Sequence, residues 1–117
     1  MSSPLQLAGA DAEETAARFL ASKGLAIVAR NFRTRFGEID LVAREGDTLV
    51  FVEVRLRTNA RFGGAAASVD SSKRARIIAS ARAYLARLGT EPACRFDVVT
   101  LDGETAQWIP AAFEVAG

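Results

Sequence analysis

One glutamate interrupts an apolar run in the segment LVFVEVRLR, which extends from Leu49 to Arg57. An ionised glutamate is rarely buried unless it is paired with a cation or coordinates a metal ion. Alternate side chains of a strand share a face, so Glu53, Arg55 and Arg57 point the same way, with about 7 Å between Glu53 and Arg55. The sequence therefore predicts a charged site on this strand, in which Glu53 needs a positive partner.

The preceding segment, GEIDLVA, alternates as a second strand and carries two further acids. Period two places Glu38, Asp40 and Val42 on one face and Ile39 on the other. A short turn joins this strand to the next, which predicts antiparallel pairing and brings Asp40 close to Glu53. Two carboxylates on one face repel each other unless a cation or a proton lies between them. Either a structural salt bridge or a metal ion would satisfy this pair.

A third acid comes from an expected helix at about Ala10–Lys23. At helical spacing Glu13 projects toward the apolar side, whereas Glu14 points toward Arg18 and solvent. Glu14 and Arg18 are spaced for a surface ion pair. Three inward carboxylates from different elements suit Mg²⁺ or Mn²⁺, because hard cations prefer oxygen ligands.

The remaining elements follow from hydrophobic periodicity and from turn residues. Asp70 or Ser71 can cap a second helix, and Gly89 can end it. At 117 residues the chain is expected to be one domain, with residues 1–8 as a flexible N-terminus. The expected strands are Leu25–Phe32, Gly37–Ala43, Thr48–Arg57, Cys94–Leu101 and a short fifth strand at TAQWI.

Three residues in the second half of the chain are expected to stabilise the fold rather than to form part of a site. Asp97 is predicted to pair with Arg95 or with the basic second helix rather than to bind a metal. Tyr84 and Trp108 are expected to pack in the core, because aromatic side chains supply much of the area that a core buries.

Composition excludes several kinds of chemistry. The chain has no histidine and one cysteine, Cys94, which excludes imidazole catalysis, His-ligated metals and an internal disulfide. Its apolar runs are far shorter than the roughly 20 residues that cross a bilayer, and its N-terminus, MSSPLQLAGADAEE, has no leader-like pattern. We therefore expect a soluble, cytoplasmic protein with no membrane segment.

Positive charge is concentrated in one part of the chain. The net charge is only +1, but residues 55–87 contain eight basic residues and one acidic residue. A solvated basic helix and a surface that binds an anionic partner both fit this distribution.

Several segments together resemble a known family, namely AEETAARFL, NFRTRFGEIDLVAREGDTLVFVEVRLR, RFGGAAASV, KRARIIASARAYL and RFDVV. They resemble the YraN family of small, uncharacterised bacterial proteins over about Gly9 to Phe113. That family is similar to archaeal Holliday-junction resolvases and to PD-(D/E)XK nucleases. The resemblance implies an α/β fold, an α+β sandwich of restriction-endonuclease-like type. Its order is α-β-β-β-α-β, with a mixed central sheet flanked by helices.

The resemblance also implies a nuclease site and a metal cofactor. Glu13, Asp40, Glu53 and Arg55 match the catalytic positions, although the family pattern has lysine where this chain has Arg55. Arginine keeps the charge but does not deprotonate, so this exchange is not conservative. Asp40, Glu53 and the backbone carbonyl of Val54 would hold Mg²⁺ or Mn²⁺, which activates water and polarises a phosphodiester, and Glu13 would complete the shell. Glu38 is a candidate outer member.

A nucleic acid is the partner that the resemblance implies, with DNA favoured over RNA and with recombination or repair as the setting. Contacts to phosphates carry no sequence information, so structure-selective cleavage is expected. Two-fold symmetric junctions would suit a homodimer. The residues expected to contact flanking phosphates are Arg57, Arg61, Lys73, Arg74 and Arg76.

Two other functions remain open at this stage. A non-catalytic nucleic-acid-binding accessory module would keep the fold and lose turnover through Arg55. An interaction protein without a nucleic acid partner would fit the near-zero net charge.

Overall fold

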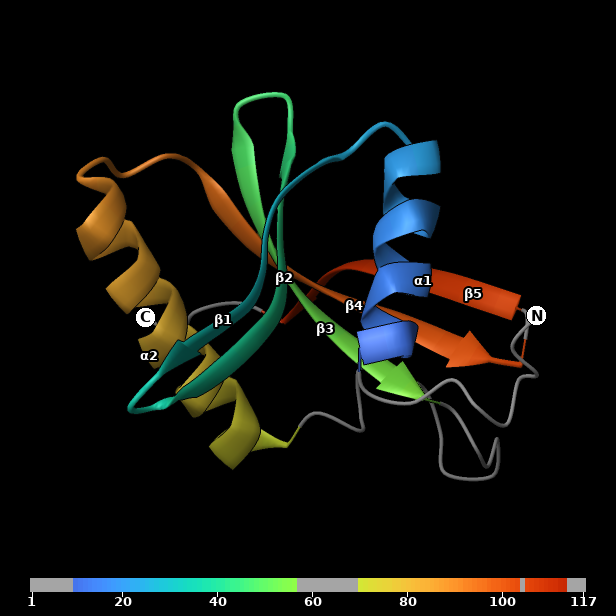
Figure 1. The fold of residues 1–117 in the computed structure, drawn as a ribbon. Helices are drawn as coiled ribbons and strands as arrows, with labels where there is room; N and C mark the ends of the chain where they lie inside the picture. The colour runs from blue at the N-terminus through green and yellow to red at the C-terminus, as the bar shows by residue number, and fades with distance from the viewer. Residues whose placement is uncertain (1–9, 57–69, 104, 114–117) are drawn as a thin grey trace.

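The computed structural model describes residues 10–56, 70–103 and 105–113, which form two helices and five strands (Figure 1). The expected flexible N-terminus, Arg57 and Arg61 lie outside the described residues. No helix in the described part is both long and apolar enough to span a membrane. The elements are α1 (Ala10–Ser22), β1 (Ala26–Thr34), β2 (Gly37–Glu45), β3 (Thr48–Leu56), α2 (Ser71–Leu88), β4 (Cys94–Asp102) and β5 (Thr105–Phe113).

The strands form one mixed sheet in the order β1-β2-β3-β4-β5. Neighbouring strands are antiparallel except β3 and β4, which are parallel. A parallel pair needs a crossover, and α2 lies in the connection between these two strands. The mixed α+β class expected from the sequence is therefore confirmed.

The helices cover opposite faces of the sheet and enclose two apolar layers (Figure 1). Leu20 of α1 packs against Leu41 of β2 and Val52 of β3 in the first layer. Ile77 of α2 packs with Phe51 and Phe96 in the second. Burial of each such large side chain contributes about 1.5–3 kcal/mol. Residues of β2 and β3 belong to both layers, so the two layers pack on opposite faces of these strands.

Local signals set the ends of α2 where the sequence predicts them. Asp70 is the N-cap, and its Oδ1 accepts a hydrogen bond of 2.8 Å from the Lys73 amide. Gly89 ends the helix with φ of 78°, and its N–H donates to the Leu85 carbonyl at 3.0 Å. Glycine adopts this left-handed conformation without the cost of a Cβ.

The expected alternation of β2 is wrong at one point. Ile39 packs in the same α2-side layer as Val42, whereas Leu41 packs on the α1 side. Two residues three positions apart cannot share a face of a regular strand. The irregularity coincides with Asn31 of β1, which has φ of 51°, and asparagine tolerates that region better than most residues.

The fifth strand is longer than the short segment expected from TAQWI. It continues through Pro110 to Phe113, with a register shift between Phe96 and Val98 of β4. Proline is tolerated here because β5 is an edge strand and the ladder is interrupted by a bulge. The Ala111 amide at this bulge donates to Asp97 Oδ1 at 2.8 Å.

Candidate functional site

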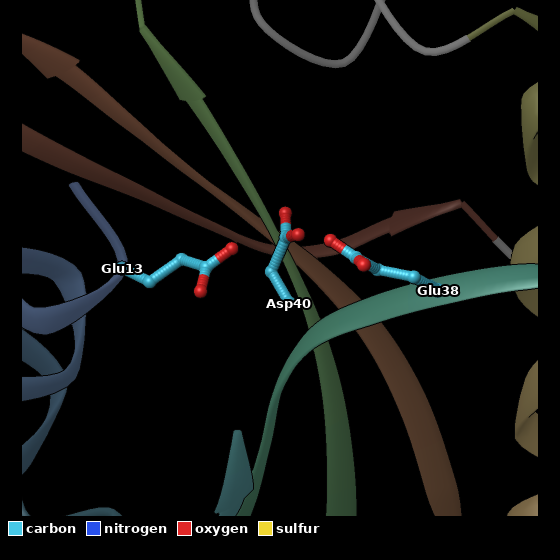
Figure 2. A group of neighbouring side chains, drawn as sticks. All are labelled: Glu13, Glu38 and Asp40. Carbon is cyan, nitrogen blue, oxygen red and sulfur yellow. The ribbon is translucent and has the colours of Figure 1, made fainter. Parts of the chain in front are cut away.

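Three carboxylates from α1 and β2 converge at one point (Figure 2). Glu13, Glu38 and Asp40 each offer an oxygen, and these oxygens all lie within 4.8 Å of one another. Asp40 occupies the middle of the group, with Glu13 on one side and Glu38 on the other (Figure 2). The sequence assigned Glu38 only an outer place, but the structure brings it into the group.

Asp40 lies where β2 separates from β3. The paired register of these strands runs only as far as Leu41 and Val52. Beyond it, the Val54 amide donates to Asp40 Oδ2 at 2.8 Å. This contact uses the Val54 N–H, and the metal-binding role expected for its carbonyl stays a prediction. The separation of the strands thus gives the Asp40 carboxylate a backbone donor and a fixed position.

The environment raises the pKa of Asp40 from 3.8 to about 8. Burial is the largest cause, because removal from water disfavours the charged form, and the negative charge of Glu53 is the next. The Val54 hydrogen bond lowers the pKa, while the charge of Glu13 raises it further. Around neutral pH Asp40 therefore holds a proton unless another positive charge takes its place.

Glu53 has two positive partners, Arg55 of its own strand, as the strand pattern indicated, and a nearer one from α2. Its side chain is only 6% exposed, and Lys73 Nζ of α2 lies 2.7 Å from its Oε1. Arg55 Nη1, from the same strand as Glu53, is farther away at 3.7 Å. The puzzle of a carboxylate in an apolar strand is thus resolved mainly by a lysine from a distant part of the chain.

A cavity of about 440 Å³ opens beside these residues. Its acidic members are Glu38, Asp40 and Glu53, and the basic side chains of Lys73 and Arg76 line it from α2. The turn between β1 and β2 completes the wall with Thr34, Arg35, Phe36 and Gly37. The cavity therefore combines an acidic group with a basic wall.

A second cavity, of about 200 Å³, lies on the other side of Asp40. Glu13 and Arg55 line it together with the backbone region of Val54. Asp40 is common to both cavities; Lys73 lines the larger one and Arg55 the smaller one, and both cations lie near Glu53 Oε1. Sequence periodicity had placed Arg55 in the same direction as Glu53.

The expected phosphate-binding residues have different environments. Lys73 and Arg76 line the larger cavity, whereas the Arg74 guanidinium lies 5.6 Å from the centre of the Phe113 ring. Arg35 was not assigned a role from the sequence, although its place in a turn directly before Glu38 could have indicated it.

The second buried acid of the sheet is structural, as expected. Asp97 is fully buried and accepts hydrogen bonds from Arg95 Nε at 3.0 Å and from Trp108 Nε1 at 2.8 Å. Arg95 also contacts Glu45 at 2.6 Å. These contacts raise the pKa of Arg95 above its ordinary value, chiefly through the hydrogen bond to Asp97. Trp108 and Tyr84 pack against the two core layers, which confirms their predicted roles.

The fold and the site define an α+β protein with a carboxylate group at the point where two sheet strands separate. The chain belongs to the uncharacterised protein family UPF0102, whose model matches residues 12–101. A UPF0102 protein of Nitrosospira multiformis is 53% identical over 114 residues, covering 95% of this chain and 96% of that protein. A UPF0102 protein of Methylobacillus flagellatus is 52% identical over 108 residues, covering 90% and 95%.

Proposed function

We propose that this protein is a Mg²⁺- or Mn²⁺-dependent endonuclease with a PD-(D/E)XK-like core, acting on DNA during recombination or repair. One observation carries the proposal, which is the position of Asp40 among Glu13, Glu38 and Glu53 with its pKa raised to about 8. Perturbed carboxyls in a cavity are typical of functional sites. The succession of one helix, three strands, a second helix and a further strand supports the nuclease-like core.

The donor set fits a hard divalent cation. Glu13, Glu38 and Asp40 offer only oxygen ligands from positions that already converge, and Mg²⁺ and Mn²⁺ prefer such ligands. Glu53 stands next to Asp40 and remains a proposed ligand. A bound divalent ion supplies Lewis-acid polarisation of the phosphodiester. Its charge would also offset the repulsion that otherwise keeps Asp40 protonated.

The basic wall of the larger cavity suits a phosphate backbone. Arg35 and Arg76 are exposed at its rim, and guanidinium groups bind phosphate oxygens in a bidentate manner. Contacts of this kind position a nucleic acid without reading its bases. Such contacts support structure-selective action on branched or gapped DNA as the proposed specificity. A homodimer that matches the two-fold symmetry of a junction is the proposed form of the protein.

Cleavage assays with a matched set of variants test this function. Junction, flap, duplex and single-stranded DNA are incubated with Mg²⁺ or Mn²⁺, and products are separated on denaturing gels. Asp40→Ala removes the central carboxylate, whereas Glu91→Ala removes an exposed acid at a distant site. We expect metal-dependent products from the wild type and from Glu91→Ala, and a loss of at least about 10²-fold in Asp40→Ala.

Arg55 supports a second candidate, a nucleic-acid-binding module without turnover, because the related nucleases have lysine at this position. Such a module would bind DNA without metal and with a steep dependence on salt. Binding that survives EDTA and Asp40→Ala, with no cleavage of any substrate, would replace the endonuclease proposal by this one.

A further inference from the structure

Lys73 is held in place by both its backbone and its side chain. Its amide donates to Asp70 Oδ1 at 2.8 Å, at the capped end of α2. Its ammonium group lies 2.7 Å from Glu53 Oε1, and two-thirds of its side chain is covered. Because its amide and its ammonium group both have partners, Lys73 presents its charge in one position. A residue that orients another active-site group must be held in this way.

The first turn of α2 is an unfavourable place for a lysine. The N-terminus of a helix carries a partial positive charge that favours acids, and the first turn of α2 contains no acid. Helix stability therefore does not account for Lys73. The ion pair with buried Glu53, across the connection between β3 and α2, is the interaction that does.

Lys73 and Arg55 both approach Glu53 Oε1, but Lys73 is nearer, at 2.7 Å against 3.7 Å, and the two residues line different cavities. Lys73 lines the larger cavity with Glu38, Asp40 and Arg76, while Arg55 lines the smaller one with Glu13. An ammonium has three donors on a compact charge, whereas a guanidinium is a wide planar fork. The Lys73 ammonium pairs with Glu53 and also lines the larger cavity, so it can donate to a group that enters there.

We infer that Lys73, rather than Arg55, is the positioning cation of the active site. It orients Glu53 beside Asp40 and offers its remaining donors to a non-bridging oxygen of the phosphodiester. This inference rests on the proposed function, since it assigns the lysine of a nuclease-like site to a helix instead of the strand. Arg55 is then a residue of the smaller cavity, and its replacement of lysine does not remove activity.

Single-turnover cleavage at saturating DNA tests the inference with a matched control. Lys73→Met removes the ammonium but keeps the stem, and Arg76→Met does the same for a cation of the same helix and cavity. We expect Lys73→Met to lose about 10²-fold in rate with little change in DNA affinity. Arg76→Met should mainly weaken DNA binding. Equal losses of rate in the two variants would overturn the inference.

A double variant separates positioning from a purely structural effect. Lys73→Met combined with Arg55→Lys returns an ammonium to the face of Glu53 from its own strand. We expect it to recover about tenfold of the lost rate, because a compact ammonium with three donors then replaces the guanidinium that lies 3.7 Å from Glu53. Circular dichroism confirms that each variant is folded at the assay temperature. No recovery in a folded double variant would count against the positioning role.

Mn²⁺ binding measured by calorimetry, without DNA, decides the inference independently of cleavage. Removal of Lys73 releases Glu53 and takes a positive charge from the acids, so Lys73→Met should bind Mn²⁺ about tenfold more tightly. In a Glu53→Gln background the same substitution should have a much smaller effect. If the wild type cleaves no DNA while this coupling is observed, the endonuclease proposal fails and the Lys73–Glu53 assignment stands. If Lys73→Met and Arg76→Met alter Mn²⁺ affinity equally, the assignment fails.

Discussion

Two aspartates of the same sheet, Asp97 and Asp40, have opposite environments. Asp97 is fully buried and receives donors from Arg95, Trp108 and the Ala111 amide. Asp40 is partly buried, receives the Val54 amide, and is surrounded by other acids. A buried carboxylate that accepts several hydrogen bonds stabilises the fold, whereas a carboxylate surrounded by other acids favours the binding of a cation.

The largest expected effect is on the Asp97 side of this comparison. Asp97→Asn leaves the Arg95 charge without its main partner and turns an amide donor toward a neighbouring donor. Breaking a buried pair in this way costs about 3–5 kcal/mol, which urea unfolding would measure. Asp102→Asn, an exposed change at the end of the same strand, should stay within about 0.5 kcal/mol. A small effect of Asp97→Asn would mean that the two aspartates are less different than their contacts indicate.

Addition of Mn²⁺ should stabilise the folded protein by binding at the Asp40 site. Binding of Mn²⁺ at a hundredfold excess over its Kd adds about 2.7 kcal/mol to the free energy of unfolding, and EDTA should reverse the gain. Thermal unfolding at pH 8 would report it as a rise in Tm. Asp40→Asn should abolish the rise. An equal rise in this variant would place the metal elsewhere.

The stability of the protein should depend on pH through Asp40, and its contribution should fall as the pH rises. The pKa of Asp40 is raised from 3.8 to about 8, so the folded protein keeps a proton in this range that the unfolded chain releases. The contribution of Asp40 to the free energy of unfolding is therefore fully present below about pH 4 and is lost as the pH rises to about 8. Asp40→Asn carries no titrating proton, and we expect it to be more stable than the wild type at pH 8 by at least about 1 kcal/mol.

Urea unfolding at pH 4 provides the control for this substitution. At pH 4 the aspartic acid of the folded protein is neutral, as asparagine is, so the difference in stability should be much smaller than at pH 8. A wild type whose stability relative to Asp40→Asn does not change between pH 4 and pH 8 would contradict the raised pKa.

The smallest expected effect compares two neighbouring glutamates of α1. Glu14 pairs with Arg18 at 3.1 Å and also with Arg30 of β1, at an exposed position. Such pairs contribute about 0.2–1 kcal/mol, so Glu14→Gln should shift the urea midpoint only slightly and leave Mn²⁺ binding unchanged. Glu13→Gln, one residue earlier, should weaken Mn²⁺ binding measured by calorimetry. Identical metal affinities in the two variants would remove Glu13 from the site.

Much of the fold could be predicted because its signals are local. Apolar spacing predicted both helices, and Asp70 and Gly89 marked the ends of α2 correctly. The length of β5 could not be predicted in this way, since its continuation past Pro110 depends on a bulge that Asp97 supports from another strand. Glu38 was underestimated for a related reason. Strand alternation placed Glu38 on the same face as Asp40, but a periodic pattern does not give the distances between side chains that bring Glu38 into the group.

The amino-acid sequence limits the chemistry of the site. With no histidine and one cysteine, any metal site must use oxygen ligands, and the positions of Glu13, Asp40 and Glu53 along amphipathic segments direct them toward one region. The balance of their charges, in contrast, depends on the folded arrangement. Lys73 reaches Glu53 because α2 packs against β2, the neighbour of β3 in the sheet. Asp40 has a raised pKa because burial and neighbouring acids act on it together. Electrostatic interactions depend on distance and on exclusion of water, and folding sets both.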